Sequence, residues 1–424
     1  DASGAQTAAH RLTERYPDSQ HAAGGFYELA ELEAARATAA SALEESRATF
    51  RNVWVLFGRQ RFPSLPWRAA ALVRSGELAL RLGALDEAAG LLVAAIEDEP
   101  PGDWTGRAYL GLATVALADD DWLAASQVLQ ELVDRSRSML DVSESELRRA
   151  RNALTLIHRL KLRPAAGQRR WQRVRRLRLE LKKPTGLAAD PEGRLTVADQ
   201  GMLQALVVGA EGGVQVRQSY EKLHRPAWGL GGEPLVAVGD GLARLASGRR
   251  LKFTDPRKQR EKALAGVLAG EQGVFREWIL LTEKPERVLV FAADGSYRGQ
   301  LTDPRHVEPA DLARDALDRL YVLDRRGKRV LRYSSSGALE GSVAASTAWK
   351  RPEALAVDLL GNVYVLDRGS RRIEVFDATG TRLATLGPTL PGGTKLANPR
   401  DLAVDGGGRL FIADSKLGAV LVLE

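Results

Sequence analysis

Few residues of this chain have the chemistry of a catalytic or metal centre. Cysteine is absent and only five histidines occur, of which the C-terminal region holds His224 and His306. Disulfides, cysteine nucleophiles and a metal centre of several histidines are therefore excluded. Three acidic residues, Asp311, Glu353 and Asp401, follow recurring prolines and could together hold a hard cation, or could equally bind water, an arginine or backbone amides. Since no phosphate loop or serine elbow motif is present, the sequence predicts no catalytic residue, no metal and no cofactor.

The acidic residues belong to a phrase that residues 184–424 repeat six times. The clearest copies are Leu355–Asp367 and Leu402–Asp414. The acids that end the six copies lie 41, 43, 41, 43 and 47 residues apart: Asp199, Asp240, Glu283, Asp324, Asp367 and Asp414. A period of this length with several short strands per unit is typical of a β-propeller blade. We expect the recurring aspartates to cap backbone N–H groups at turns.

The two ends of this region predict how the ring closes. The last copy stops at 418–424, which corresponds to a third strand, so its outer strand is missing. Residues 173–181 are strand-like and have no blade of their own. We therefore expect them to complete the last blade, which gives a six-bladed propeller over 173–424. A proline opens five of the six copies: Pro184, Pro226, Pro309, Pro352 and Pro399. The residues just after these blade-opening prolines should line one end of the propeller axis: Thr185, Trp228, Asp311, Glu353, Arg400 and Asp401.

These phrases resemble the NHL repeat family of six-bladed propellers, whose units combine a Leu-Ala-Val-Asp phrase with a Leu-Tyr-Val-Ala-Asp phrase. Copies five and six match well, copies one and four less well, and copies two and three poorly. The resemblance implies the fold but leaves the function open, because the family includes lyases, RNA-binding proteins and protein-binding platforms.

Residues 1–163 have helical periodicity instead. Apolar residues at 72, 73, 76, 79 and 80 share one face and those at 85, 88, 89, 92 and 96 the next, with Gly83 between them. The spacing resembles the 34-residue tetratricopeptide repeat family, which implies a concave groove for a partner's helix or peptide; alternatively, the repeats only pack against the propeller. Ser143–Glu146 reads as a capping box that opens a last helix to about Lys161. The sequence thus predicts an α-solenoid followed by an all-β propeller.

Positive charge is concentrated between these regions. The chain carries a net charge of +7, and residues 148–183 hold fourteen lysines and arginines against Glu180 alone. A basic linker at 164–172 and the strand after it could bind nucleic acid or another polyanion. The candidate residues for this are Arg169, Arg170, Arg173, Arg175 and Arg176. Alternatively, these arginines form the solvent face of the closing strand, which is the interpretation we favour.

The main prediction from these patterns is a protein that is not an enzyme and that docks other protein subunits in an extracytoplasmic bacterial assembly. The residues expected to contact partners on the propeller are Trp228, Arg325, Arg326, Arg368, Arg371 and Arg372. Two alternatives are a polyanion-binding propeller and a lactonase-like, metal-dependent hydrolase that uses Asp311, Glu353 and Asp401. The junction Tyr16-Pro-Asp-Ser19 is common in periplasmic tetratricopeptide proteins, so the resemblance implies a periplasmic or extracellular location and a removed signal peptide or lipid anchor; a cytoplasmic location is the alternative.

Overall fold

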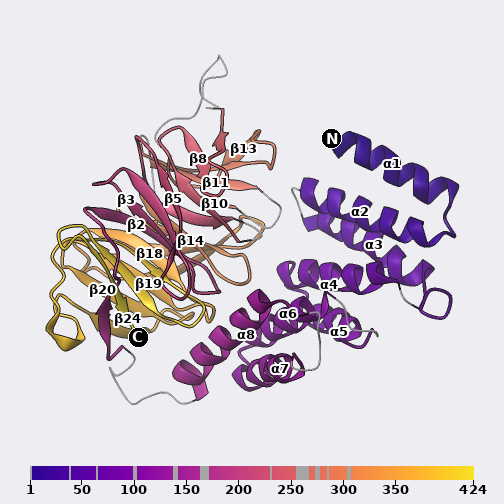
Figure 1. The fold of residues 1–424 in the computed structure, drawn as a ribbon, viewed down its shortest axis with the longest axis horizontal. Coiled ribbons are helices and arrows are strands. Elements are labelled where there is room, and N and C mark those ends of the chain that lie inside the picture. Colours follow the sequence, from indigo (N-terminus) through magenta and orange to yellow (C-terminus); the bar gives the residue numbers. More distant parts are fainter. Residues whose placement is uncertain are drawn as a thin grey trace. The chain divides into compact units, whose positions relative to one another are not determined.

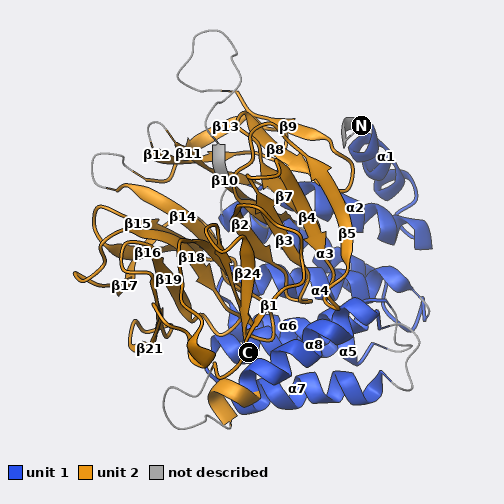
Figure 2. Cartoon of the chain, turned by 60° about the vertical axis from the view of Figure 1, so that its left-hand side comes forward, with its two compact units in different colours: residues 1–157 blue, residues 158–424 orange. Residues whose placement is uncertain are grey.

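The chain forms two compact units. The computed structural model describes residues 2–37, 40–63, 65–98, 103–136, 142–162, 171–229, 232–254, 267–272, 277–283, 286–302 and 307–424 (Figure 1). Contacts within the chain separate Asp1–Ile157 from His158–Glu424 (Figure 2). Within the ranges just given, no helix is both long and apolar enough to cross a membrane.

The first unit is helical, as predicted. Its described residues form eight helices: α1 (Ala2–Arg15), α2 (Gln20–Arg36), α3 (Ala40–Leu56), α4 (Pro66–Arg81), α5 (Leu85–Ile96), α6 (Thr105–Ala118), α7 (Trp122–Arg135) and α8 (Glu144–Ile157). Each helix packs against the next one in the sequence. Gly76 allows α4 and α5 to approach closely, since a Cβ atom there would lie 2.8 Å from the Cγ of Leu92.

The capping box at the start of α8 is confirmed. The backbone N–H of Ser143 donates to Glu146 Oε2 (2.9 Å), and the backbone N–H of Glu146 donates to Ser143 Oγ (3.2 Å). These two bonds satisfy N–H groups that have no partner within the helix. The α-helix ends earlier than predicted, at Ile157, and a π-helix over His158–Leu162 follows it.

The second unit is a propeller of six four-stranded sheets, which confirms the predicted fold class. The first blade comprises β2 (Pro184–Ala189), β3 (Leu195–Asp199), β4 (Gln204–Val208) and β5 (Val214–Ser219). The second comprises β6 (Pro226–Gly229), β7 (Glu233–Ala237), β8 (Gly241–Arg244) and β9 (Arg250–Lys252). The third comprises β10 (Val267–Gln272), β11 (Trp278–Glu283), β12 (Glu286–Phe291) and β13 (Tyr297–Gln300). The others comprise β14 (Pro309–Arg314), β15 (Leu320–Asp324), β16 (Arg329–Tyr333) and β17 (Leu339–Ala345); β18 (Pro352–Val357), β19 (Val363–Asp367), β20 (Arg372–Phe376) and β21 (Arg382–Leu386); and β22 (Pro399–Val404), β23 (Leu410–Asp414) and β24 (Ala419–Leu423) with β1 (Val174–Arg176).

The ring closes through β1, which pairs antiparallel with β24 and places Val174 opposite Leu423. The ladder is shorter than the predicted 173–181 because the chain then turns toward the first blade. There the backbone N–H groups of Lys182 and Lys183 donate to the carboxylate of Asp199 at 2.7 and 2.8 Å. A strand from the start of the propeller therefore completes its last blade as the outermost strand, in the order β1-β24-β23-β22, and β24 keeps no open edge.

The recurring aspartates hold turns together, as expected. The carboxylate of Asp414 accepts four backbone N–H groups at 2.7–3.1 Å, from the two residues before β22 and from the turn after β23. Asp199 and Asp367 accept N–H groups at the corresponding positions of their blades. In the poorly matching second copy, Asp240 instead lies 3.8 Å from Arg250. The repeated acid is therefore a structural clamp between the first two strands of a blade.

Candidate functional site

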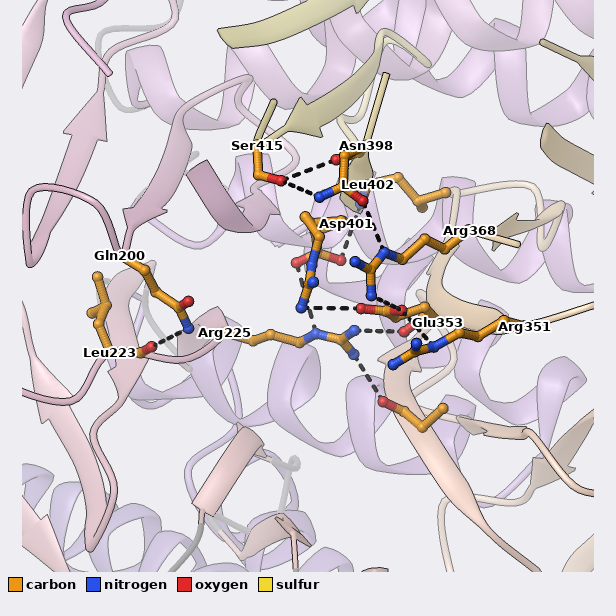
Figure 3. Close-up of polar contacts among 12 residues, drawn as sticks. Gln200, Leu223, Arg225, Arg351, Glu353, Arg368, Asn398, Asp401, Leu402 and Ser415 are labelled. Carbon is orange, nitrogen blue, oxygen red and sulfur yellow. Dashed lines mark hydrogen bonds and ion pairs between the residues drawn. The ribbon is translucent and has the colours of Figure 1, made fainter. Parts of the chain in front are cut away.

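We call the side of the propeller at which the innermost strands begin the opening face. Near its centre lies Arg225, directly before Pro226. Its backbone is fixed, because its carbonyl oxygen accepts the N–H of Ala237 (2.9 Å). Its side chain is only 16% exposed and reaches across the ring to other blades (Figure 3). A buried guanidinium needs several acceptors, so its surroundings decide its role.

Oxygen atoms from three blades surround this guanidinium. Nη1 donates to the carbonyl oxygen of Ala310 (3.0 Å) and forms an ion pair with Asp311. Nη2 donates to the carbonyl oxygen of Glu353 (2.5 Å), and Nε lies 3.9 Å from Asp401 Oδ2. Burial lowers the pKa of Arg225, but the neighbouring carboxylates raise it by more and leave it above its usual value. Arg225 therefore remains a permanent positive charge.

The two aspartates beside Arg225 are also anchored to neighbouring blades. Asp311 Oδ2 accepts the backbone N–H of Leu355 (2.8 Å), and Asp401 Oδ2 accepts that of Leu187 (2.9 Å). Burial raises the pKa of both carboxyl groups, that of Asp401 to about 7, although Arg225 acts in the opposite direction. Each carboxylate thus links one innermost strand to the next.

Glu353 is shared by three further arginines. Its carboxylate lies 3.2 Å from Nη1 of Arg368, 3.3 Å from Nε of Arg351 and 3.2 Å from Nη2 of Arg400. Arg368 also donates from Nε to the side-chain oxygen of Asn398 (3.0 Å) (Figure 3). Burial and the nearby arginines lower the pKa of Arg400. Positive charge is therefore in excess over negative charge here.

These contacts test whether a metal ion fits among Asp311, Glu353 and Asp401, the candidates from the sequence. The structure brings the three residues together, but their oxygens face guanidinium groups, with Arg225 between Asp311 and Asp401. In the part of the chain that the structure describes, no group of acidic or histidine side chains has the arrangement of a metal site. The donor set is already engaged by arginine, so a metal ion does not fit it.

A hollow of about 510 Å³ adjoins the arginines on the opening face. Three of the residues that line it are lysines, and Asn398 and Ser415 form a polar pair next to Arg368. The lining residues are Lys182, Lys183, Gly201, Ala397, Asn398, Ser415 and Lys416. Asn398 Nδ2 and Ser415 Oγ lie 2.8 Å apart. The lysine side chains are exposed, and this lining is therefore strongly basic.

A second hollow, of about 750 Å³, shares Lys183 with the first. It contains His224, next to Arg225, together with Gln200 and Glu283. Burial lowers the pKa of His224 below its usual value, although Glu283 raises it. The imidazole is therefore neutral at pH 7 and can accept a proton.

The residues predicted to contact partners are partly engaged within the propeller. The indole N–H of Trp228 donates to the carbonyl oxygen of Ala188 (3.1 Å), and Arg194 covers its ring at 4.5 Å. Arg325 pairs with Glu308 (3.0 Å). Of the remaining residues of this prediction, Arg326, Arg368 and Arg371 lie at the turns after β15 and β19, and Arg372 begins β20. Arg368 joins the cluster around Glu353.

The basic junction is used within the fold where the structure describes it. Arg175 pairs with Glu424 (3.0 Å), and Arg176 donates to the carbonyl oxygens of Leu417 and Gly418 (3.1 Å each). Arg173 lies next to them, and its backbone pairs with that of Glu424. The other two candidates, Arg169 and Arg170, lie outside the described residues.

Comparison with known proteins finds similarity in structure only. No family model matches the sequence, and no curated protein matches it. A gluconolactonase from Xanthomonas campestris is similar at 18% identity and a TM-score of 0.47, over 59% of this chain and 89% of that one. Virginiamycin B lyase from Staphylococcus aureus is similar at 13% identity and a TM-score of 0.42, over 57% of this chain and 81% of that one. The calcium-binding protein regucalcin from Agrobacterium tumefaciens is similar at 16% identity and a TM-score of 0.44, over 58% of this chain and 90% of that one. At these values the likeness concerns the fold alone.

The comparison corrects the main functional prediction. The similar proteins include a gluconolactonase, a lyase and a luciferin-regenerating enzyme, whereas the sequence predicted a non-catalytic docking subunit that is not an enzyme. That prediction is wrong, because it treated the scarcity of histidines and the lack of known motifs as the lack of an active site. The chemistry of this chain has to be argued from its own residues.

Sequence reasoning missed the centre of the site. Arg225 was not singled out, although it directly precedes a blade-opening proline, as Lys183, Arg351 and Asn398 do in their blades. The scarcity of histidines argues against a metal site at His224 and says nothing about its use as a proton acceptor. The available signal was positional: the residues before the recurring prolines share one face, and most of them are polar or charged.

Proposed function

We propose that the propeller is an enzyme that binds a small anionic substrate at the opening face and hydrolyses a lactone or other ester bond in it. One observation carries the proposal: a neutral, partly buried histidine lines the same hollow as Lys183, and Lys183 also lines the strongly basic hollow. A neutral imidazole can act as a general base, and clustered ammonium and guanidinium groups attract an anion.

The excess positive charge supports an anionic substrate. Four arginines face three carboxylates around the axis, and the pKa of one of these, Asp401, is raised to about 7. The three lysines of the adjoining hollow make no ion pair with any described residue. A carboxylate or phosphate on the substrate would therefore be bound without removing an existing partner.

The chemistry assigned to the residues is that of ester hydrolysis. His224 takes a proton from water, and the hydroxyl oxygen attacks the acyl carbon of the substrate. The carbonyl oxygen becomes negatively charged and is stabilised by the ammonium group of Lys183. When the acyl C–O bond breaks, the protonated imidazole returns the proton to the leaving oxygen, which yields an alcohol and a carboxylic acid. The acid then releases its proton to the solvent and becomes a carboxylate.

The test is whether the full chain hydrolyses a panel of carboxylated and phosphorylated lactones. Hydrolysis is measured by titrating the released acid at constant pH. We expect His224→Gln to lower kcat about 100-fold or more, while His10→Gln, at an exposed position of the helical unit, serves as the matched control. Because burial lowers the pKa of His224, kcat/KM should fall only when the pH drops below the ordinary pKa of histidine. If the unaltered protein hydrolyses a lactone and the His224→Gln variant hydrolyses it at the same rate, His224 is not the general base.

The anionic part of the proposal has its own test. Replacing Lys182, Lys183 and Lys416 with glutamine should raise KM most for phosphorylated substrates, and rising salt should have the same effect on the unaltered protein. If neither the lysine substitutions nor added salt change KM, the protein does not recognise its substrate by charge.

We also infer, on the repeat patterns, that the helical unit is of the tetratricopeptide type and the propeller of the NHL type. A peptide held by the helical unit, a protein partner for the chain and a periplasmic location remain proposals. Pull-down of partners with the full chain from its host and fractionation of that host are the corresponding tests.

A further inference from the structure

The centre of the opening face has the composition of a cation site. Asp311 and Asp401 are 4% and 2% exposed, and the carbonyl oxygens of Ala310 and Glu353 point to the same place. Two carboxylates and two main-chain carbonyls are the hard oxygen donors that Ca²⁺ prefers. Here a single guanidinium receives them.

We propose that Arg225 is a built-in cation that takes the place of a metal ion at the centre of this propeller. Three blades converge on the guanidinium through Ala310, Asp311, Glu353 and Asp401. The residue thus neutralises buried carboxylates that would otherwise be costly, because an uncompensated charge in the interior strongly destabilises a fold.

A tethered cation differs physically from a bound ion. The backbone of Arg225 is held by the N–H of Ala237 and by the ring of the following Pro226, so its charge cannot dissociate or be removed by a chelator. Guanidinium also stays charged at any pH the fold survives. The propeller should therefore keep the same stability and the same site over a wide range of divalent-cation concentrations.

The inference predicts a gain of function when the side chain is removed. Arg225→Ala leaves the oxygens of Ala310, Asp311, Glu353 and Asp401 around an open space, and a divalent cation can then enter it. Removing one partner of a buried ion pair should lower the Tm by about 10 °C. Millimolar Ca²⁺ should restore most of that loss, with a Kd on the order of 10⁻⁴–10⁻³ M.

The experiment compares thermal melts and calorimetric titrations of the full chain with Ca²⁺, Mn²⁺ and EDTA. The unaltered protein should show no change in Tm and no binding with any of the three. Arg244→Ala is the matched control, since Arg244 is another partly buried, paired arginine of the same blade, 2.6 Å from Glu233. Its Tm should not respond to cations.

Two further variants keep the test decisive. Arg225→Lys retains a charge and should remain insensitive to Ca²⁺, even if Arg225→Ala fails to fold. Adding Asp311→Asn and Asp401→Asn to Arg225→Ala should abolish the response to Ca²⁺. Binding of one Ca²⁺ or Mn²⁺ per chain to the unaltered protein, lost on Asp401→Asn, would overturn the inference. So would an Arg225→Ala variant that folds and ignores every cation.

Discussion

Replacing Asp367 with alanine should destabilise the propeller by removing one of its clamps. This carboxylate is 2% exposed and accepts the backbone N–H groups of Lys350 (3.0 Å), Arg351 (2.6 Å) and Gly369 (3.2 Å). Alanine leaves all three donors without this acceptor. The change also frees the backbone that presents Arg351 to Glu353, so the perturbation extends to the proposed site.

The magnitude follows from these bonds. A hydrogen bond to a charged group contributes about 1.5–3 kcal/mol, and N–H groups near the surface recover part of it from water. We therefore expect a loss of about 3 kcal/mol in the free energy of unfolding, which corresponds to a drop of about 6–12 °C in Tm for a unit of this size.

The pH dependence gives a second, independent readout. Burial raises the pKa of Asp367, but hydrogen bonds from Ser370 and from backbone N–H groups lower it by more and leave it below its usual value. A carboxyl group with a lowered pKa stabilises the fold above its unfolded pKa, and this contribution is lost as the pH falls through its folded pKa. The Tm difference between the two proteins should be full at pH 7 and smaller near pH 3.

The assay is calorimetry of the full chain, with the propeller transition followed separately from that of the helical unit. Asp377→Ala is the control, because Asp377 accepts the N–H groups of Thr379 and Thr381 (2.9 Å each) in an exposed turn and should shift the Tm by about 2 °C or less. An Asp367→Ala protein that melts like the control, or whose deficit is as large at pH 3 as at pH 7, would refute the clamp.

Two further substitutions test packing. Trp171→Ala should destabilise the propeller by about 3–5 kcal/mol, since this 1% exposed side chain meets the ring of Tyr364 edge-on at 6.0 Å; an unchanged denaturant midpoint would contradict it. Gly106→Ala should destabilise the helical unit by about 1–3 kcal/mol, because the new Cβ would lie 2.6 Å from Glu146 Cδ. At Gly90 an added Cβ would have no atom within 4 Å, so Gly90→Ala should stabilise the same unit by about 0.5–1 kcal/mol. Thermal melts followed by far-UV circular dichroism measure both glycine variants.

The fold was predictable because its signals are local and repeated. The spacing of Asp199, Asp324, Asp367 and Asp414 follows from one backbone requirement, a clamp between the first two strands of a blade, so each copy reinforces the others. The missing outer strand of the last copy was informative for the same reason, and β1 fills that gap. The exact length of β1 was harder to predict, since the strand ends at Arg176 although residues up to Leu181 continue the strand-like sequence pattern.

The site was only partly predictable because its contacts cross the ring. The positions of Asp311, Glu353 and Asp401 after prolines placed them on one face, and the structure brings them together. Nothing in the sequence pairs Arg225, in a poorly conforming copy, with Asp311 about two blades later. Burial also decides the protonation of His224, and burial of a single histidine has no signature in a single sequence.

The pairing of β1 with β24 sets the order in which this propeller can be completed during synthesis. Val174 and Leu423 are partners across the whole length of the ring, and a ribosome adds only about 5–20 residues per second. The first strand therefore waits tens of seconds for its partner, with its backbone donors and acceptors unpaired. During that interval the nascent chain is most exposed to intermolecular strand pairing, and translation speed through the last blade should govern the yield of native protein.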